Sequence, residues 1–336
     1  MPRAHRALLA LAAALAFAPV CAQEARPAPP LPIADVHFHL MLFMTPADLK
    51  EHMDRHNIRW TLSAGAVGNP GVASPATRDA AVRQLLGERF IPATGASETY
   101  LAERRIGPRF YSDEPGPERE EALGRIDTQM AAPPRMLAET FPNAETSSAD
   151  PLRRRRVATD GPFFRRLMAI AVREKRPVPM HMQWHPDSVA QLSQLLQDHP
   201  GGQVLLSHCG KDTTAADIRT MLDKHPNLFC DLSFRGAPLA LQESQKDPNR
   251  LVFWGPGLLQ AAGIRPEWRQ LIEDHSDRFM VGIDDVHSWG VYDDTVAAIR
   301  EGVLAKLTPA TAEKVAWRNA ERLFRLPPVE APAAAN

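Results

Sequence analysis

Short apolar runs alternate with longer amphipathic segments through most of the chain. The run from Ile33 to Leu40 places polar and apolar residues on alternate faces, which predicts a strand. Thr45 followed by Pro46 then predicts the start of a helix that runs to about Asn57. The same reasoning predicts strands over 33–40, 59–67, 90–96, 135–141, 177–184, 203–209, 228–234 and 278–285, helices over 46–57, 75–88, 118–130, 162–175, 188–198, 214–224, 266–274, 293–305 and 309–324, and a long loop over 97–117.

Eight strands that are each followed by a helix predict an α/β protein with a parallel sheet, closed as a (β/α)8 barrel of the triosephosphate isomerase (TIM) type. An open, doubly wound sheet is the competing fold. It is disfavoured because the first strand-to-helix turn lacks the G-x-G-x-x-G pattern. It is also disfavoured because the candidate polar residues lie on strands at both ends of the sequence, which a closed barrel brings together.

The two ends of the chain differ in composition from its middle. Residues 1–22 combine a basic start, an apolar run and small residues before a cut, which predicts a signal peptide and a secreted or periplasmic protein. Cys21 leaves a lipid anchor as the less favoured alternative, because Val20 fits poorly before it. The rest of the chain is predicted to consist of three segments: a Pro- and Ala-rich linker over 23–32, the barrel over 33–326 and a disordered tail over 327–336.

Charge and cysteine content narrow the class of protein further. Without residues 1–22 the chain keeps 37 basic and 40 acidic side chains, a formal charge of −3, which predicts no affinity for nucleic acid. No later apolar run is long enough for a membrane span. Cys209 and Cys230 remain, either as a disulfide or, in the simpler case, as two buried thiols. A small-molecule substrate is expected, and a homo-oligomer is left open.

Ligand-type side chains recur near the C-terminal ends of the predicted strands, where barrel enzymes keep their active sites. His37 and His39 share one face of the first strand, so two imidazoles converge on one point, with Asp35 available to orient a ring. Each residue alone has an ordinary structural explanation, but a full set at matching positions predicts a metal site at this face of the barrel. The predicted ligands are His37, His39, Glu139, His181, His208 and Asp284.

The chain resembles the amidohydrolase superfamily, in particular its amidohydrolase-related (amidohydrolase 2) metal-dependent hydrolases. The resemblance rests on the segments 35–39, 177–181, 204–210, 282–284 and 319–324. It implies that His37 and His39 hold one metal, that His181 and His208 hold a second, and that Asp284 binds metal and handles the proton of the attacking water. The bridging lysine that is frequent in the family is missing, and Glu139 stands in its place, as in the branch whose bridge is a glutamate.

The expected function is an exported hydrolase that uses metal-bound hydroxide to cleave a small ester, lactone, amide or phosphoester. Asp284 is the expected catalytic residue. The cofactor is one or two divalent ions, zinc in the first place and manganese as the alternative. A single-metal decarboxylase (lyase) and a catalytically inactive metal-containing binding protein are the two rival functions. Residues expected to face substrate are Trp184, His185, Lys211, Arg235 and His287. For Asp231, on the seventh predicted strand, support of a ligand side chain is the open alternative.

Two further segments have open interpretations. Residues 235–265 form a long connection with several apolar side chains, which predicts either a cover over the barrel mouth or an oligomer contact. The four arginines 153–156 are expected to form a solvated face, with attraction of an anionic substrate as the alternative.

Overall fold

The structure is a computed structural model that describes residues 30–65, 75–114, 116–131, 136–145, 154–210, 213–233, 259–260 and 263–328. From Leu31 onwards the chain forms one compact unit. The predicted signal peptide and most of the predicted linker, tail and 235–265 segment lie outside the described residues, as do Lys211 and Arg235. Within the described parts, no helix is both long enough and apolar enough to cross a membrane.

The strands form a ring of parallel neighbours. They are β1 (Ile33–Phe38), β2 (Ile58–Ser63), β3 (Phe90–Ile91), β4 (Ala93–Thr94), β5 (Met136–Leu137), β6 (Thr140–Asn143), β7 (Val178–Met182), β8 (Val204–Leu206), β9 (Leu228–Asp231) and β12 (Phe279–Met280). β3 and β4 are two halves of one strand interrupted at Pro92, and β5 and β6 are two halves of another interrupted at residues 138–139. The described residues therefore contain eight barrel strands, as predicted. A short antiparallel pair, β10 (Leu259–Gln260) and β11 (Gly263–Ile264), lies outside this count.

The ring closes between its first and last strands. Parallel pairing runs from β1 through β2 to β3, from β4 to β5, and from β6 through β7, β8 and β9 to β12. The N–H of Glu139 donates to the carbonyl of Ala64 at 2.9 Å, and the N–H of Val36 donates to the carbonyl of Val281 at 3.1 Å. A parallel bridge also joins Phe38 to Asp284. These contacts confirm the (β/α)8 barrel over the open sheet.

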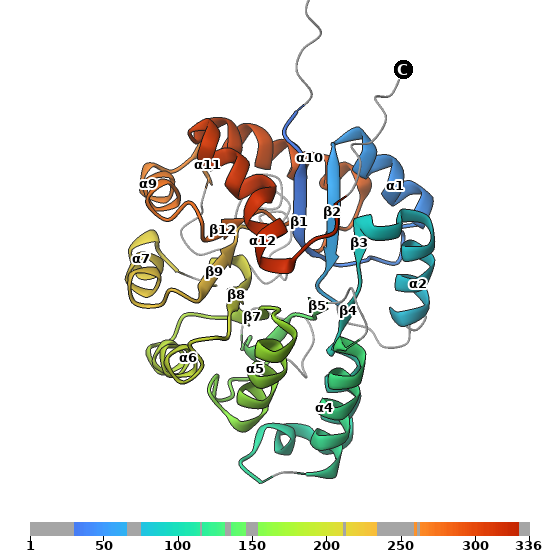
Figure 1. Cartoon of the computed structure of the whole chain (residues 1–336), viewed down its shortest axis with the longest axis vertical. Helices are drawn as coiled ribbons and strands as arrows, with labels where there is room; N and C mark the ends of the chain where they lie inside the picture. The colour runs from blue at the N-terminus through green and yellow to red at the C-terminus, as the bar shows by residue number, and fades with distance from the viewer. Residues whose placement is uncertain are drawn as a thin grey trace, which may run out of the picture. The chain divides into compact units, whose positions relative to one another are not determined.

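Helices surround the strands on the outside (Figure 1). They are α1 (Pro46–Arg55), α2 (Pro75–Leu86), α3 (Ala96–Ile106), α4 (Pro117–Met130), α5 (Pro162–Glu174), α6 (Pro186–Asp198), α7 (Ala215–Lys224), α9 (Pro266–Asp274), α10 (Trp289–Ala297), α11 (Pro309–Glu313) and α12 (Asn319–Phe324). Many begin at a proline, whose missing N–H costs nothing in the first turn. Thr45 caps α1 by accepting the N–H of Asp48 at 3.1 Å, as its position before Pro46 predicts.

The loop predicted over 97–117 is wrong, because α3 and a 3-10 turn over Gly107–Tyr111 fill most of it. The buried face of α3 carries Glu103, which is 5% exposed. Arg155 donates to Glu103 and to the hydroxyl of Tyr111, both at 2.6 Å. A charged pair on the buried face hides the apolar spacing by which helices are recognised.

The arginine run forms the expected solvated face in part, because Arg154 and Arg156 are exposed and Arg155 is not. Arg155 is held in the buried group just described, and Arg156 pairs with Asp187 at 3.3 Å. Arg153 lies outside the described residues. At least these two arginines therefore connect the loop after β6 to α3 and α6.

Cys209 and Cys230 form a disulfide, with Cα atoms 4.6 Å apart, so the simpler expectation of two free thiols is wrong. The pairing of β8 with β9 sets Leu206 opposite Cys230, and the turn after β8 brings Cys209 beside it. Both side chains are completely buried. The bond links the ends of two neighbouring barrel strands.

Candidate metal centre

The predicted metal ligands converge at the C-terminal ends of the barrel strands. They come from β1, the β5–β6 junction, β7, the turn after β8 and the segment after β12. Each is buried, with 2–6% of its surface exposed. The set consists of His37, His39, Glu139, His181, His208 and Asp284. The fold thus gathers residues that are up to about 250 positions apart in the sequence, as the closed barrel predicts.

The first part of the centre contains His37 and His39, whose Nε2 atoms lie 3.2 Å apart. Nδ1 of His37 lies 3.1 Å from a carboxylate oxygen of Asp231, and Nδ1 of His39 lies 2.8 Å from the carbonyl oxygen of Gly65. Because these oxygens only accept hydrogen bonds, each Nδ1 carries a proton, and each Nε2 is the ring atom left to bind a further proton or a metal ion. Oδ1 of Asp284 lies 3.6 and 3.4 Å from the two Nε2 atoms. Three ligand atoms therefore face one point.

This arrangement fits a cation. Two imidazole lone pairs facing each other at 3.2 Å repel unless a proton or a metal ion lies between them. An ion with tetrahedral bonds of about 2.1 Å sets its ligand atoms about 3.4 Å apart. The separations of 3.2, 3.4 and 3.6 Å match that spacing. Imidazole and carboxylate are also the ligands that zinc takes in catalytic sites.

The second part of the centre contains His181 and His208. Nδ1 of His181 lies 3.2 Å from Nε2 of His208, and the two atoms lie 3.3 and 3.4 Å from Oε1 of Glu139. The other oxygen of Glu139, Oε2, lies 3.6 and 3.5 Å from the Nε2 atoms of His37 and His39. Glu139 thus directs one oxygen to each pair of histidines, the position that a bridging carboxylate requires.

Asp231 supports the centre from β9. One of its oxygens accepts the Nδ1 proton of His37, and the other accepts the backbone N–H of His208 at 3.1 Å and of Ser233 at 3.0 Å. Of the two acids expected to support a ligand, Asp231 holds the ring of His37 and Asp35 does not, because Asp35 accepts from the backbone N–H of His37 and Ile283. Ser233 was not predicted. Its hydroxyl lies 3.0 Å from Nδ1 of His208, and its spacing of two from Asp231 is the signal that could have found it.

A family model described as amidohydrolase matches residues 142–326, more than half of the chain. The chain belongs to the amidohydrolase family. This confirms the resemblance drawn from the sequence motifs. No curated protein matches the sequence of this amidohydrolase.

Solved structures with the same fold include three that span nearly the whole chain. An amidohydrolase from Burkholderia multivorans with bound HEPES is 15% identical, covers 88% of this chain and 100% of its own, and has a TM-score of 0.51; the same protein was also solved with zinc. A probable 2-pyrone-4,6-dicarboxylic acid hydrolase from Acinetobacter baumannii with citric acid bound is 13% identical, covers 87% and 99%, and has a TM-score of 0.50. A dihydroorotase from Campylobacter jejuni is 11% identical, covers 90% and 85%, and has a TM-score of 0.51. At these identities the likeness shows the barrel fold.

Charges within the centre of this amidohydrolase compensate one another. Burial disfavours the charged form of His37, but the carboxylates of Glu139, Asp231 and Asp284 outweigh burial and hold the pKa of this imidazole well above its usual value. Burial likewise opposes ionisation of Glu139, but His37 and the hydrogen bonds from the neighbouring histidines hold the pKa of this carboxyl well below its usual value. The neighbouring carboxylates therefore stabilise a positive charge at the Nε2 atom of His37.

The pKa values of two other groups in the centre are shifted mainly by burial. Burial raises the pKa of Asp284 to about 7, against the opposing charges of His37 and His39. Burial lowers the pKa of His208 to about 3, despite its hydrogen bond with Glu139. A carboxyl that exchanges its proton near neutral pH suits a general base, and a neutral imidazole suits a metal ligand.

Close packing around His37 depends on one glycine. A Cβ at Gly282 would lie 2.7 Å from the Cβ of His37 and 2.9 Å from that of Ser233, which real side chains do not tolerate. The segment after β12 can therefore approach β1 only because residue 282 has no side chain. This approach brings Asp284 to His37 and His39.

The predicted substrate-facing residues that the structure describes lie outside the cluster of ligands. Trp184 and His185 follow β7 and are half-buried, and Nε2 of His185 lies 3.5 Å from a carboxylate oxygen of Glu145. His287 follows β12 and is exposed. Contact of these residues with a substrate stays a prediction.

A further histidine cluster lies between α1 and α10. Nδ1 of His52 and Nε2 of His56 each lie 2.7 Å from the same carboxylate oxygen of Asp293. The other oxygen of Asp293 accepts from Arg55 at 3.3 Å, and the ring of Trp289 stacks on that of His52 at 4.2 Å. The carboxylate of Asp293 thus accepts from two ring N–H groups and one guanidinium, and these hydrogen bonds account for the cluster as a contact between α1 and α10.

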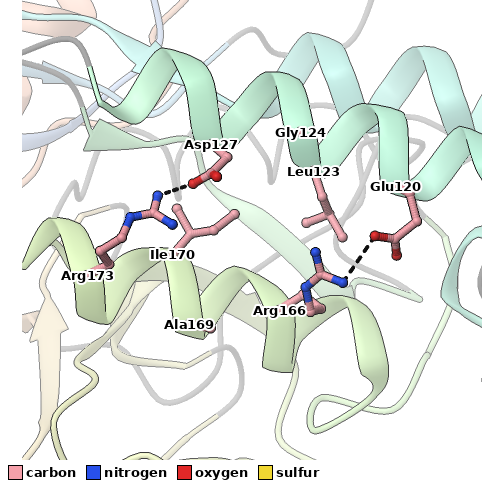
Figure 2. A pocket seen from close by; sticks show the side chains of 8 residues that line it. All are labelled: Glu120, Leu123, Gly124, Asp127, Arg166, Ala169, Ile170 and Arg173. Carbon is pink, nitrogen blue, oxygen red and sulfur yellow. Dashed lines mark hydrogen bonds and ion pairs between the residues drawn. The ribbon is translucent and has the colours of Figure 1, made fainter.

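A groove between α4 and α5 lies among the outer helices (Figure 2). Arg166 pairs with Glu120 at 3.0 Å, and Arg173 pairs with Asp127, across an apolar floor that contains Ile170. None of the predicted metal ligands lines this groove, and its charged groups pair with one another. It therefore adds no candidate chemistry to that of the metal centre.

Proposed function

We propose that this amidohydrolase is an exported, metal-dependent hydrolase that cleaves a small ester, lactone, amide or phosphoester. The observation that carries the proposal is the position of Glu139, whose two oxygens face two different pairs of histidines. A dinuclear hydrolytic site needs an anion between its ions, to offset their repulsion at about 3.5–4 Å. A single-metal decarboxylase has no such requirement.

The two halves of the centre would hold one divalent ion each. A divalent ion held there would lower the pKa of a coordinated water and would polarise the C=O or P=O bond of a substrate. Asp284 would accept the proton of the attacking water and return it to the leaving group; burial raises the pKa of this carboxyl, and a bound cation would lower it again. The residues for the first ion are His37, His39 and Asp284 with Oε2 of Glu139, and those for the second are His181 and His208 with Oε1 of Glu139.

Zinc is the proposed metal, with manganese as the alternative. Four imidazoles and two carboxylates form a donor set with more nitrogen than manganese usually takes, since carboxylate and water oxygens suit that ion better. Zinc bound to the Burkholderia relative supports the same choice. Analysis of bound metal after purification distinguishes the two ions.

Export is proposed from the composition of residues 1–22 and is supported by the disulfide between Cys209 and Cys230. Structural disulfides persist in oxidising compartments such as the periplasm and are rare in the cytosol. N-terminal sequencing of the protein recovered from the periplasm tests the proposed cut after residue 22. An uncut chain recovered from the cytosol would contradict export.

Metal stoichiometry and hydrolysis, measured together on the same preparations, test the proposed function. The wild type should bind two zinc ions and hydrolyse at least one substrate of the four bond types, and chelation should abolish that activity. Glu139→Gln keeps the size of the side chain but loses the charge between the histidine pairs, so metal content should fall towards one ion and hydrolysis should be lost. Glu51→Gln is the matched control, because Glu51 lies on the outer side of α1 with 68% of its side chain exposed.

The rival functions predict different results in the same assays. A decarboxylase would bind one ion in both the wild type and the Glu139 variant, and would release carbon dioxide from a carboxylated substrate. An inactive binding protein would hold metal but turn over neither kind of substrate. Either result would replace the proposed hydrolase.

A further inference from the structure

An aromatic ring that the metal chemistry does not use lies directly beside the centre. Phe141 lies on β6, two residues after Glu139. Its ring centroid lies 5.1 Å from that of His181, with 31° between the ring planes. Phe141 is half-buried, whereas the ligands around it are buried. The ring therefore covers one side of a proposed ligand and remains partly accessible.

A second ring lies on the neighbouring strand end. Trp184 comes three residues after His181 and is also half-buried. A Cβ at Gly210 would lie only 3.2 Å from Cε3 of Trp184, so the indole packs closely on the turn that follows His208. Phe141 and Trp184 thus accompany the two histidines of the second half of the centre.

In the described part of the chain, the charged groups that follow Trp184 are paired with charged groups of the neighbouring loop. His185, next to Trp184, lies 3.5 Å from Glu145, and Arg156 lies 3.7 Å from the same carboxylate and 3.3 Å from Asp187. These ion pairs place opposite charges together at the rim, which does not favour a charged substrate group there. Partly exposed aromatic rings at such a position favour a flat apolar group instead.

From this placement we infer that Phe141 and Trp184 form an apolar subsite that binds a planar, uncharged part of the substrate, such as an aryl ring, beside His181 and His208. The inference rests on the proposed function, because it places the bond to be cleaved at the metal centre. It narrows the substrate from small esters, lactones, amides and phosphoesters in general to those with an aryl or similarly flat apolar group.

Two phosphonates that differ only in their apolar group test the subsite without any turnover. Calorimetric titration of the zinc-loaded full chain compares phenylphosphonate with methylphosphonate, whose anionic head groups are alike. We expect the wild type to bind the phenyl compound about tenfold more tightly, since stacking on an aromatic ring adds to the effect of area burial. Phe141→Ala should lower this preference at least threefold, and Phe141→Trp, which keeps an aromatic face, should retain it.

The control is Leu101→Ala, because Leu101 is an apolar residue on α3 with 55% exposure, and its removal should leave the preference unchanged. Phe141→Leu serves if Phe141→Ala unfolds, because it keeps a packed apolar side chain and removes only the ring. The inference is overturned if the wild type binds both phosphonates equally or binds neither. It is also overturned if the folded Phe141 variants keep the full preference.

A parallel hydrolysis assay separates the inference from the proposed function. If the phenyl preference depends on Phe141 but no ester, lactone, amide or phosphoester is cleaved, the subsite stands and the hydrolase proposal falls. If hydrolysis occurs with equal kcat/KM for phenyl and methyl substrates and Phe141→Ala changes both alike, the hydrolase stands and the subsite falls.

Discussion

Replacement of Asp231 by Asn tests whether the proton position on His37 controls metal binding. The oxygen of Asp231 that accepts from the backbone N–H groups of His208 and Ser233 has an equivalent in the amide oxygen of Asn. The oxygen that accepts the Nδ1 proton of His37 at 3.1 Å becomes an NH2 group, which donates. His37 then has to carry its proton on Nε2, and the lone pair that faces His39 is lost.

The expected magnitude follows from the burial of this contact. Loss of a carboxylate that orients a metal-bound histidine weakens metal affinity by about 10–100-fold, equivalent to about 1.4–2.8 kcal/mol. We expect the upper part of this range, because His37 is 2% exposed and Asp231 is 0% exposed, so no bulk water replaces the lost acceptor. Zinc affinity at His181 and His208 should change little, since the amide oxygen keeps the bond to the backbone of His208.

Competition between metal-free protein and a chromophoric zinc chelator measures both affinities in one titration. Asp293→Asn is the matched control, because it makes the same change in a carboxylate that also accepts from two histidines, away from the centre. Wild-type zinc affinity at both sites of Asp231→Asn would refute the reasoning. Thermal unfolding of the metal-free variants separates a specific loss of zinc from a general loss of structure.

Two further predictions concern the proposed base and the disulfide. The carboxylate form of Asp284 is the active base, and burial raises its pKa to about 7 while a bound cation lowers it, so kcat/KM should fall on the acid side at or below pH 7. Asp284→Asn should lose that limb of the pH–rate profile and about 10²–10⁴-fold in rate; an unchanged limb would assign it to another group. The disulfide between Cys209 and Cys230 closes a segment of 21 residues, so its loss in the double serine variant should cost about 3 kcal/mol in the free energy of unfolding, measured by urea denaturation. Equal stability of the wild type with and without a reductant would contradict this.

The barrel and the identity of its polar cluster could be predicted because both follow from local periodicity. His37 and His39 share a face since side chains alternate along a strand, and His181 and His208 come at the ends of their apolar runs. In a parallel barrel all strand ends of one kind meet at one face, so no knowledge of distant contacts was needed to place these residues together.

The contacts that tune the centre could not be predicted in the same way, because they join residues that are distant in sequence. Asp231, on the strand before the last barrel strand, could be proposed as a supporting acid, but the sequence did not show that it holds the ring of His37 in place of Asp35, the nearest acid along the chain. The partner of His39 is a backbone carbonyl, that of Gly65, which no side-chain pattern marks. The helix α3 was missed for a similar reason. Its buried face carries Glu103, which pairs with the distant Arg155, so the apolar spacing that predicts a helix is interrupted.

The backbone at two proposed ligands explains why these distant contacts matter. His208 and Asp284 have φ angles of 57° and 72°, in the left-handed region that costs a residue with a side chain about 1–2 kcal/mol. The N–H of Asp284 donates to the carbonyl of His37 at 2.6 Å, and the N–H of His208 donates to Asp231. Because hydrogen bonds from the neighbouring strands hold both residues in this conformation, their ligand atoms are directed into the centre by the folded barrel itself. Binding of an ion then requires little reorganisation of these two residues, and this advantage comes from the closure of the barrel rather than from the motifs that identify it.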